Sequence, residues 1–350
     1  MTSTDRVREA FERQARACDS LGSPFTARLC RMAAARLDGA STVGRTILEW
    51  SGDASGGGDA LPLRFAGALH AIVLSGQDVR LQAAYPPHTV DDDKLWSAIL
   101  AAMDTHQAFI LDRLTSAPQT NEIRRSGVLL PGFLTIAKLF GRPLDLLEVG
   151  ASAGLNLQWD RYCYRLGATD WGDPASAVHL APEWQGPNPP SAEIRVHGRL
   201  GCDLNPLDPT SKDDRLRLMS YVWADQTDRM ERLAAALSIA ANAPPAVERA
   251  DARSWLPRVL AKPRENNTRV VYHSVAWQYL PPQAQAEAEA IINEAGNRAT
   301  QDAPLARLAM EADEKPDGAA VTLQVWPGGE RQEIARADFH GRWVKWKGWS

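Results

Sequence analysis

The sequence predicts an α/β fold. An all-helical N-terminal domain over residues 1–140 precedes a mostly parallel sheet with a C-terminal antiparallel hairpin over residues 141–350. In the first part, apolar residues recur at helical spacing and no convincing strand is present. In the second, short apolar runs alternate with helical segments, the pattern of βαβ units. The sequence WPGG at 326–329 separates the last two apolar runs and predicts a hairpin turn.

The N-terminal part begins with a clear amphipathic helix. Its apolar side chains recur at helical spacing, at Val7, Ala10, Phe11 and Ala15. Ser23 followed by Pro24 predicts an N-cap and a proline in the first helical position. Further helices are expected at 62–75, 92–114 and 121–140. The glycine-rich stretch 51–60 lacks the Gly-Lys-Ser/Thr of a phosphate loop, so we interpret it as a linker.

The strands of the second part are read from short apolar runs bounded by turn residues. The first is LDLLEV at 144–149, and EIRVHGRLGCDL at 193–204 contains the second. Further strands are predicted within 246–251, 268–275, 304–312, 319–326 and the alternating stretch 333–346.

Composition restricts the partners that can be expected. The chain has 350 residues and a net charge of -4, which gives no electrostatic case for nucleic acid. No apolar run approaches the roughly 18 residues of a membrane span, and the charged N-terminus lacks a signal region. Four cysteines without a Cys-x-x-Cys pair predict reduced thiols and no metal framework. We therefore expect a cytoplasmic protein with a small-molecule partner; the oligomeric state cannot be read.

The turn after the first strand carries the main functional signal. Glu148, Gly150, Ser152 and Gly154 follow one another at every second position. Small residues allow a ligand to approach the backbone, and the N-terminus of a following helix offers free N–H donors. A sheet of this kind binds ligands at the carboxyl ends of its strands, where the strand order reverses. The turn therefore predicts a Rossmann-like cofactor site.

Three further polar residues are expected in the same site. Asp203 ends the second predicted strand, where a carboxylate can accept hydrogen bonds from ribose hydroxyls. Asp251 lies just after the third strand. Asn156 begins the helix predicted after the glycine turn and is expected to line the same pocket.

The pattern Glu-x-Gly-x-Ser-x-Gly resembles the cofactor loop of class I S-adenosylmethionine-dependent methyltransferases, which usually carry glycine at the position of Ser152. This resemblance covers roughly Leu144 to Trp346, and the terminal hairpin is similar to that family's antiparallel last strand. It implies S-adenosylmethionine as the cofactor, with Asp203 as its ribose ligand and Asp251 facing the adenine edge.

The whole chain more closely resembles a bacterial family catalogued as domain of unknown function 2332, a name that implies no established activity. The stretches that carry this likeness are QTNEIRRSGVLLPGF, LEVGASAGLNL, GCDLNPLDP, VVYHSVAWQYLP and ADFHGRWVKW.

Other interpretations of the turn remain open. NAD binding is disfavoured, because Ser152 occupies the second glycine position and Asp203 is far beyond the usual spacing of about 20 residues. Gly-x-Ser-x-Gly is also the pattern of a serine nucleophile elbow, with Asp251 and His340 as an available acid and base. However, only helices precede the turn and no His-Gly-Gly oxyanion stretch occurs. A tight turn in which Ser152 merely caps a helix is the third reading.

Candidate substrate residues follow the fourth predicted strand and precede the first. His273 and Tyr279 are candidate catalytic groups, because a histidine can accept a proton near neutral pH. Trp277 is a candidate substrate contact, although a structural histidine and a core tryptophan are equally compatible with the pattern. Asn121 and Arg124 belong to a polar cluster that could grip an anionic group, or form a solvated first turn.

The function expected from these features is transfer of a methyl group from S-adenosylmethionine to an unidentified small molecule. Hydrolysis through Ser152 and non-catalytic binding of S-adenosylmethionine are the alternatives. The sequence does not identify the substrate, the acceptor atom or whether catalysis is retained.

Overall fold

The computed structural model describes residues 2–350, which divide into two compact units. One extends to Thr120 and includes Lys212–Glu231; the other comprises Asn121–Ser211 and Arg232–Ser350. We had expected a single boundary between residues 140 and 141. It lies earlier because helix α8 (Arg125–Phe140) packs on the sheet, where Gly132 lies so close to Leu308 that a Cβ would be 2.5 Å from its Cδ1.

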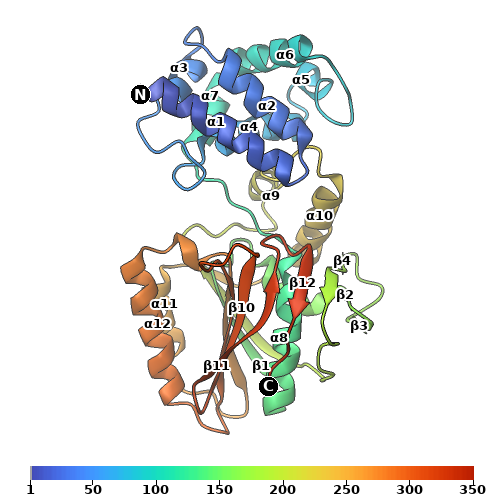
Figure 1. The fold of residues 1–350 in the computed structure, drawn as a ribbon, viewed down its shortest axis with the longest axis vertical. Coiled ribbons are helices and arrows are strands. Elements are labelled where there is room, and N and C mark those ends of the chain that lie inside the picture. Colours follow the sequence, from blue (N-terminus) through green and yellow to red (C-terminus); the bar gives the residue numbers. More distant parts are fainter. Residues whose placement is uncertain (1) are drawn as a thin grey trace. The chain divides into compact units, whose positions relative to one another are not determined.

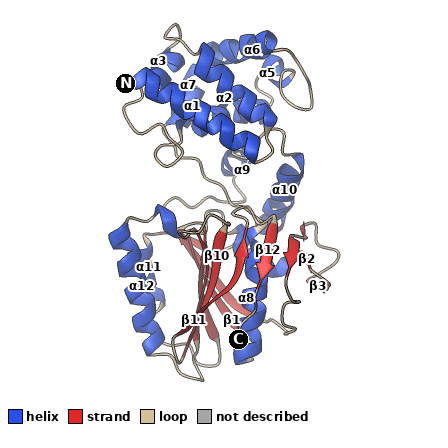
Figure 2. Cartoon of the chain, viewed as in Figure 1, coloured by secondary structure: helices blue, strands red, loops and turns tan. Residues whose placement is uncertain are grey.

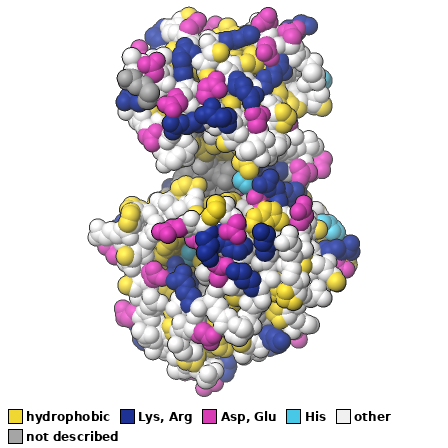
Figure 3. Space-filling model, viewed as in Figure 1, with side chains coloured by type: hydrophobic (Ala, Val, Ile, Leu, Met, Phe, Trp, Pro, Cys, Tyr) yellow, Lys and Arg dark blue, Asp and Glu magenta, His cyan; other side chains and the backbone are white. Residues whose placement is uncertain are grey.

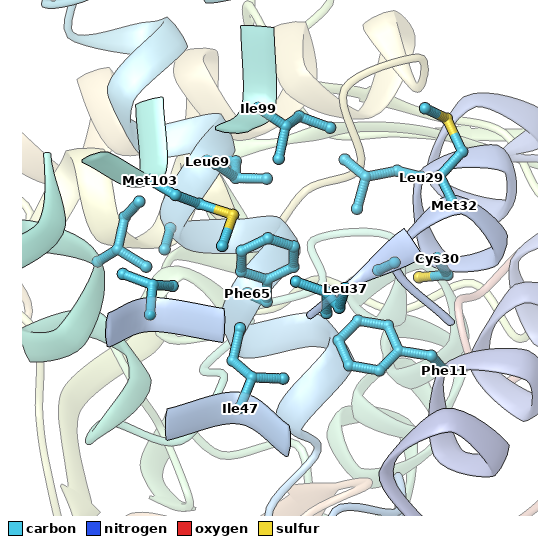
Figure 4. Close-up of a cluster of buried hydrophobic side chains, with 14 of the residues drawn as sticks. Phe11, Leu29, Cys30, Met32, Leu37, Ile47, Phe65, Leu69, Ile99 and Met103 are labelled. Carbon is cyan, nitrogen blue, oxygen red and sulfur yellow. The ribbon is translucent and has the colours of Figure 1, made fainter. Parts of the chain in front are cut away.

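The first unit is helical, as predicted. Its helices are α1 (Ser3–Ser20), α2 (Pro24–Arg36), α3 (Thr42–Leu48), α4 (Leu61–Leu74), α5 (Val79–Gln82), α6 (Asp92–Thr105), α7 (Gln107–Leu114) and α9 (Lys212–Ser220). Residues 92–114 thus form two helices instead of one. Phe11 of α1 meets Phe65 of α4 edge to face, with ring centroids 6.2 Å apart, and Figure 4 shows Phe65 among Leu37, Ile47 and Met103. This core excludes water from one face of each long helix.

The segment Lys212–Glu231 joins the first unit through specific contacts. Ser23 occupies the predicted N-cap of α2, but its hydroxyl donates to the carboxylate of Asp225. The amide of Phe25 donates to the other oxygen of Asp225 at 2.8 Å. The ring of Tyr221 packs against Gly67, where a Cβ would lie 2.7 Å from the ring. A distant carboxylate therefore supplies the cap that α2 lacks locally.

Replacing Asp225 by alanine is expected to lower the free energy of unfolding of the first unit by roughly 1–3 kcal/mol, because a buried donor loses its charged acceptor. Chemical denaturation followed by circular dichroism measures this change. Asp93→Ala is the control, since Asp93 is 90% exposed in its ion pair with Arg36 and should change stability by less than about 0.5 kcal/mol. Equal effects of the two substitutions would contradict the capping role.

The second unit contains all strands of the described chain (Figures 1 and 2). Its main sheet has the order β5-β12-β11-β10-β9-β8-β1-β6-β7. The parallel strands are β1 (Leu144–Val149), β6 (Val196–Asp203), β7 (Val247–Arg249), β8 (Thr268–Ser274) and β9 (Leu305–Glu311). Across the sheet these five strands follow one another as β7-β6-β1-β8-β9. The first strand of the chain therefore lies in the middle and later strands are added on both sides, which is the arrangement of a doubly wound sheet. The predicted fold class is confirmed.

The C-terminal strands extend this sheet in the antiparallel sense. They are β10 (Ala319–Trp326), β11 (Glu330–Ala337) and β12 (Trp343–Trp346), with β5 (Glu183–Gln185) beside β12. The predicted turn at 326–329 joins β10 to β11. The alternating stretch 333–346 forms two strands, because Asp338 holds the intervening turn through the amides of His340 and Arg342.

Helices cover both faces of the sheet. Figure 1 shows α8 on one face and α11 (Ala252–Val259) with α12 (Pro282–Asn297) on the other. Neighbouring residues of β9 confirm this, since Leu308 faces α8 whereas Arg307 bonds to Glu289 of α12. Side chains that alternate along a strand therefore reach different layers.

The connection after β1 differs from the expected helix. A 3₁₀ helix (Leu155–Arg161) follows the turn, and a small sheet follows it, formed by β2 (Cys163–Leu166), β3 (Thr169–Trp171) and β4 (His179–Leu180). Tyr162 and Tyr164 direct their hydroxyls to the carbonyls of Leu155 and Trp159, both at 2.6 Å. These bonds fix Tyr162 and Tyr164 beside the 3₁₀ helix, a position that they would leave if the helix continued further. The remaining α-helix, α10 (Thr227–Asn242), precedes β7, and a short 3₁₀ helix (Trp277–Tyr279) follows β8.

The surface carries charges of both signs. On the face drawn in Figure 3, basic and acidic side chains are interspersed. Across residues 2–350, every helix is too short or too polar to traverse a bilayer.

Candidate functional site

The candidate site lies at the carboxyl ends of β1, β6 and β8. β1 pairs with β6 on one side and with β8 on the other, so the strand order reverses at β1. Connections leave in opposite directions at such a point, which makes it the usual ligand site of an open parallel sheet. Gly150–Gly154 follows β1 there, Asp203 ends β6, and Val275–Tyr279 follows β8.

The glycine turn is closed by bonds within the chain. The amides of Gly150 and Ala151 donate to the carbonyl of Cys202 at 2.9 and 3.0 Å, which joins the turn to β6. Gly150 and Gly154 both have left-handed backbones, with φ of +73° and +68°. A Cβ at Gly150 would lie 2.6 Å from the Cβ of Ala276. Glycine is thus required here both for conformation and for close packing.

Ser152 has an unusual conformation within this turn. Its φ is +53°, in the left-handed region that non-glycine residues rarely adopt. The side chain is buried, and Oγ has no hydrogen-bond partner among residues 2–350. A serine nucleophile requires a base within hydrogen-bond reach, and the described chain places none on this hydroxyl. Backbone strain of this kind is found at functional sites, and it persists only where the surrounding structure holds the residue in its conformation.

The two aspartates have different surroundings. Asp203 Oδ2 accepts the amide of Ser152 at 2.9 Å and Oδ1 accepts that of Asn205 at 2.8 Å, so this carboxylate joins β6 to the glycine turn. Each oxygen can accept a second bond. Asp251 caps α11 and forms an ion pair with Arg253, whose hydrogen bond lowers the pKa of Asp251.

Glu148 is a buried acid on the α8 face of the sheet. It is 2% exposed, and the hydroxyl of Tyr272 lies 3.4 Å from its Oε2. Burial raises the pKa of Glu148 well above its ordinary value of 4.5, against the opposing effect of the Tyr272 hydrogen bond. Burial therefore favours the uncharged form of Glu148.

The segment before α8 is bonded to the glycine turn. Asn121 Oδ1 accepts the amide of Leu155 at 3.0 Å. Asn156 donates to the carbonyl of Glu122 and accepts the hydroxyl of Ser126 at 2.7 Å. Predicted residues Asn121 and Asn156 are thus brought together, yet their side-chain oxygens bind the chain itself.

The neighbouring arginines have separate contacts. Arg124 precedes α8, and its amide donates to Glu122 Oε1 at 3.2 Å. Arg125 donates to the carbonyl of Ser274 at 3.1 Å and to that of Phe339 at 3.0 Å. Sequence reasoning selected Arg124, but Arg125 makes the bonds that join the end of β8 to the turn before β12. Because the two arginines are adjacent in one helical turn, the sequence alone does not distinguish their roles.

His273 is enclosed in the α12 face of the sheet. It is 1% exposed, with Nδ1 2.7 Å from Glu311 Oε1 and Nε2 3.3 Å from the Arg307 guanidinium. Because Glu311 accepts and Arg307 donates, we assign the proton of the neutral ring to Nδ1. Burial lowers the pKa of His273, with Glu311 opposing the shift. Both nitrogens have partners, which favours a positioning role over proton transfer.

Trp277 and Tyr279 differ in exposure. Trp277 is buried, stacks on the His273 ring at 4.3 Å between centroids and lies under the Arg307 guanidinium. Tyr279 is 75% exposed at the same edge of the sheet. The candidate substrate contact is therefore a core residue, whereas the candidate catalytic tyrosine can be reached from solvent.

Glu311, at the end of β9, is a site residue that sequence reasoning missed. Its Oε1 accepts from His273 and from the amides of Ala276 and Trp277, at 3.1 and 3.2 Å. Burial alone would raise the pKa of Glu311, but these bonds outweigh it and lower the pKa. The sequence did contain a signal for Glu311, because this acid ends an apolar strand. The carboxyl ends of parallel strands share one edge of the sheet, so such an acid is expected near the site.

Comparison with known proteins gives a family but no activity. A family described as "Uncharacterized protein conserved in bacteria (DUF2332)" matches residues 8–346. No curated protein and no solved structure match the chain. Within residues 2–350, no group of three or more His, Cys, Asp or Glu side chains is arranged to hold a metal ion.

Proposed function

The chain belongs to this family of uncharacterized bacterial proteins, and from the geometry of its site we propose that it binds S-adenosylmethionine and transfers the methyl group to a small molecule. The observation that carries the proposal is the bond between Asp203 and the amide of Ser152 at 2.9 Å. It puts a carboxylate, at the end of the strand beside β1, against the glycine turn at the point where strand order reverses.

Asp203 is suited to a ribose in this position. Its two oxygens each accept one backbone amide and each retain a lone pair for a second donor. A vicinal diol can donate one hydroxyl to each oxygen. Hydrogen bonds to a charged acceptor contribute about 1.5–3 kcal/mol each, enough to dominate recognition of the sugar.

The glycine turn favours a nucleoside ligand without phosphates. Five amides at this turn already have acceptors within the chain, namely those of Gly150, Ala151, Ser152, Gly154 and Leu155. A pyrophosphate is normally bound by free amides at a helix N-terminus. This turn lacks that set of donors, which supports S-adenosylmethionine over a dinucleotide such as NAD.

The methyl group of the bound cofactor is activated by its sulfonium. The protein has to align a nucleophile with it and remove a proton where the nucleophile carries one. Tyr279 is the predicted catalytic residue that solvent reaches. We propose it as a substrate contact that hydrogen-bonds the nucleophile, whose proton, where it carries one, is released to solvent. His273 supports the turn that precedes Tyr279, because it stacks on Trp277 and binds Glu311.

Calorimetric titration with S-adenosylmethionine and S-adenosylhomocysteine tests the proposal. We expect saturable binding by the wild-type protein. Asp203→Ala should weaken it by at least about tenfold, and Asp203→Asn by less because one acceptor oxygen survives. Asp203→Ala should also lower the melting temperature, because two amides lose their acceptor.

Asp173→Ala is the matched control. Asp173 accepts the amide of Ala175 at 2.8 Å in a turn after β3, so it tests loss of a turn cap outside the site. Unchanged affinity of folded Asp203→Ala would reject the ribose contact. No binding of either compound by the wild type would reject the function.

Hydrolysis through Ser152 is the second candidate, favoured by the left-handed backbone of this serine in a strand-to-helix turn. Its buried hydroxyl without a base argues against it. Covalent labelling of Ser152 by a fluorophosphonate probe, absent in Ser152→Ala, would replace the methyltransferase proposal. Cofactor binding without release of S-adenosylhomocysteine across a panel of small-molecule acceptors would favour a non-catalytic binding protein.

A further inference from the structure

The turn after β8 is held in a conformation that its own sequence disfavours. Val275 has a φ of +51°, although a β-branched side chain is rarely left-handed. Such a residue persists only where the surrounding structure determines its conformation from several sides. The next residue, Ala276, then lies against Gly150, with 2.6 Å between its Cβ and the position of a Cβ on Gly150. The conformation of Val275 therefore sets how closely this turn packs on the glycine turn.

Three of the bonds that oppose this strain converge on one oxygen. Glu311 Oε1 accepts the amides of Ala276 and Trp277, immediately after Val275, and also His273 Nδ1, immediately before Ser274. The amide of Val275 itself donates to the carbonyl of Met310, beside Glu311, at 2.8 Å. Both sides of the strained residue are thus bound to the last two residues of β9.

The second carboxylate oxygen makes no comparable bond. Glu311 Oε2 is buried and has no hydrogen-bond partner among residues 2–350. The three hydrogen bonds of the Glu311 side chain therefore all involve Oε1, and an amide nitrogen in place of Oε2 would displace no existing bond. Charge nevertheless strengthens the three bonds to Oε1, because hydrogen bonds to an ionised acceptor are about twice as strong as neutral ones.

We infer that Glu311 is a positioning residue of the ligand site, which holds Val275 left-handed and thereby fixes Ala276 against Gly150. The contacts run from β9 through the turn after β8 to the turn after β1, so a change at Glu311 reaches the glycine turn without touching it. The ligand measurement below rests on the proposed function, whereas the stability measurement does not.

The inference predicts that glycine at position 275 substitutes for the anchor. Glycine adopts a left-handed φ without steric cost, so Val275→Gly removes the strain that Glu311 opposes. Glu311→Ala should weaken S-adenosylhomocysteine binding by at least about tenfold, and Glu311→Gln by roughly threefold, since its oxygen remains an acceptor. When Val275→Gly is also present, each Glu311 substitution should change the logarithm of the dissociation constant by no more than about half as much, as expected for coupled residues.

The control is Glu289→Gln, at the outer end of the same network. Glu289 binds Arg307 at 3.1 Å and is 40% exposed, and Arg307 contacts His273. This substitution should lower stability slightly and leave S-adenosylhomocysteine affinity unchanged. An affinity loss equal to that of Glu311→Gln would show a general effect of the network and overturn the inference.

Calorimetry with S-adenosylhomocysteine and thermal unfolding are measured on the wild type, Glu311→Gln, Glu311→Ala, Val275→Gly and both double variants. If Glu311→Ala does not fold, the Glu311→Gln pair decides. Additive effects of positions 275 and 311 on both affinity and melting temperature would overturn the inference. If the wild type binds no S-adenosylhomocysteine, the proposed function fails, and the melting temperatures alone decide whether Glu311 holds the turn.

Discussion

Gly150→Ala is expected to abolish measurable S-adenosylhomocysteine binding and to destabilise the second unit by roughly 3 kcal/mol. The left-handed φ of +73° costs an alanine about 1–2 kcal/mol. The added methyl would lie 2.6 Å from the Cβ of Ala276, an overpacked contact that costs about 1–3 kcal/mol more. Relief of this contact has to separate the turns after β1 and β8, which are the two sides of the candidate site.

Gly141→Ala is the matched control for this substitution. Gly141 has a similar φ of +62°, but a Cβ there would meet no atom within 4 Å. It lies at the end of α8, at the opposite end of β1 from the candidate site. We expect a loss of about 1–2 kcal/mol from backbone strain alone, with unchanged affinity. Equal effects of the two substitutions on affinity would show that the position of Gly150 in the site is irrelevant.

Glu148→Gln should stabilise the protein relative to the wild type, increasingly so as the pH rises. Burial raises the pKa of Glu148 in the folded state, whereas the unfolded chain ionises near the ordinary value of 4.5. Between these two values the folded state holds one proton more than the unfolded state. The stability that Glu148 contributes is therefore complete below pH 4.5 and is lost as the pH rises, at about 1.4 kcal/mol per pH unit, until the folded pKa is reached.

Glutamine does not titrate, so the difference between the two stability curves isolates this loss. Urea unfolding of wild type and Glu148→Gln at several pH values from 4.5 to 8 measures it. The exposed Glu265→Gln serves as the control for loss of a negative charge. Parallel curves for wild type and Glu148→Gln would contradict the elevated pKa. Glu265→Gln keeps Glu148, so its curve should run parallel to that of the wild type.

Secondary structure was largely predictable because its signals are local. The buried face of α1, at Val7, Ala10, Phe11 and Ala15, follows a helical period that the sequence displays directly. The apolar runs of β1, β8 and β9 are likewise buried throughout nearly their whole length. The helix predicted after Gly154 was wrong, because Tyr162 and Tyr164 fix a shorter 3₁₀ turn through contacts that no period reveals.

The position of the candidate site was predictable for the same reason, but the partners of its residues were not. A glycine turn and an acid at the end of a strand identify the carboxyl edge of the sheet without any knowledge of strand order. Whether Asp203 faces only solvent or also binds Ser152 depends on β6 lying beside β1. His273 and Glu311 meet only because β8 pairs with β9.

The sequence by itself determined the helical and sheet-forming parts of this protein, the turn at Gly150–Gly154 and the acid at Asp203, since periodicity and turn chemistry act over a few residues. Only the tertiary structure decided that Lys212–Glu231 completes the helical unit, that both nitrogens of His273 are occupied, and that Glu311 holds the strained turn at Val275. Those outcomes depend on residues that are between 34 and 200 positions apart in the chain. Which donor meets which acceptor across such distances is set by packing of the strands and helices, and no local pattern encodes it.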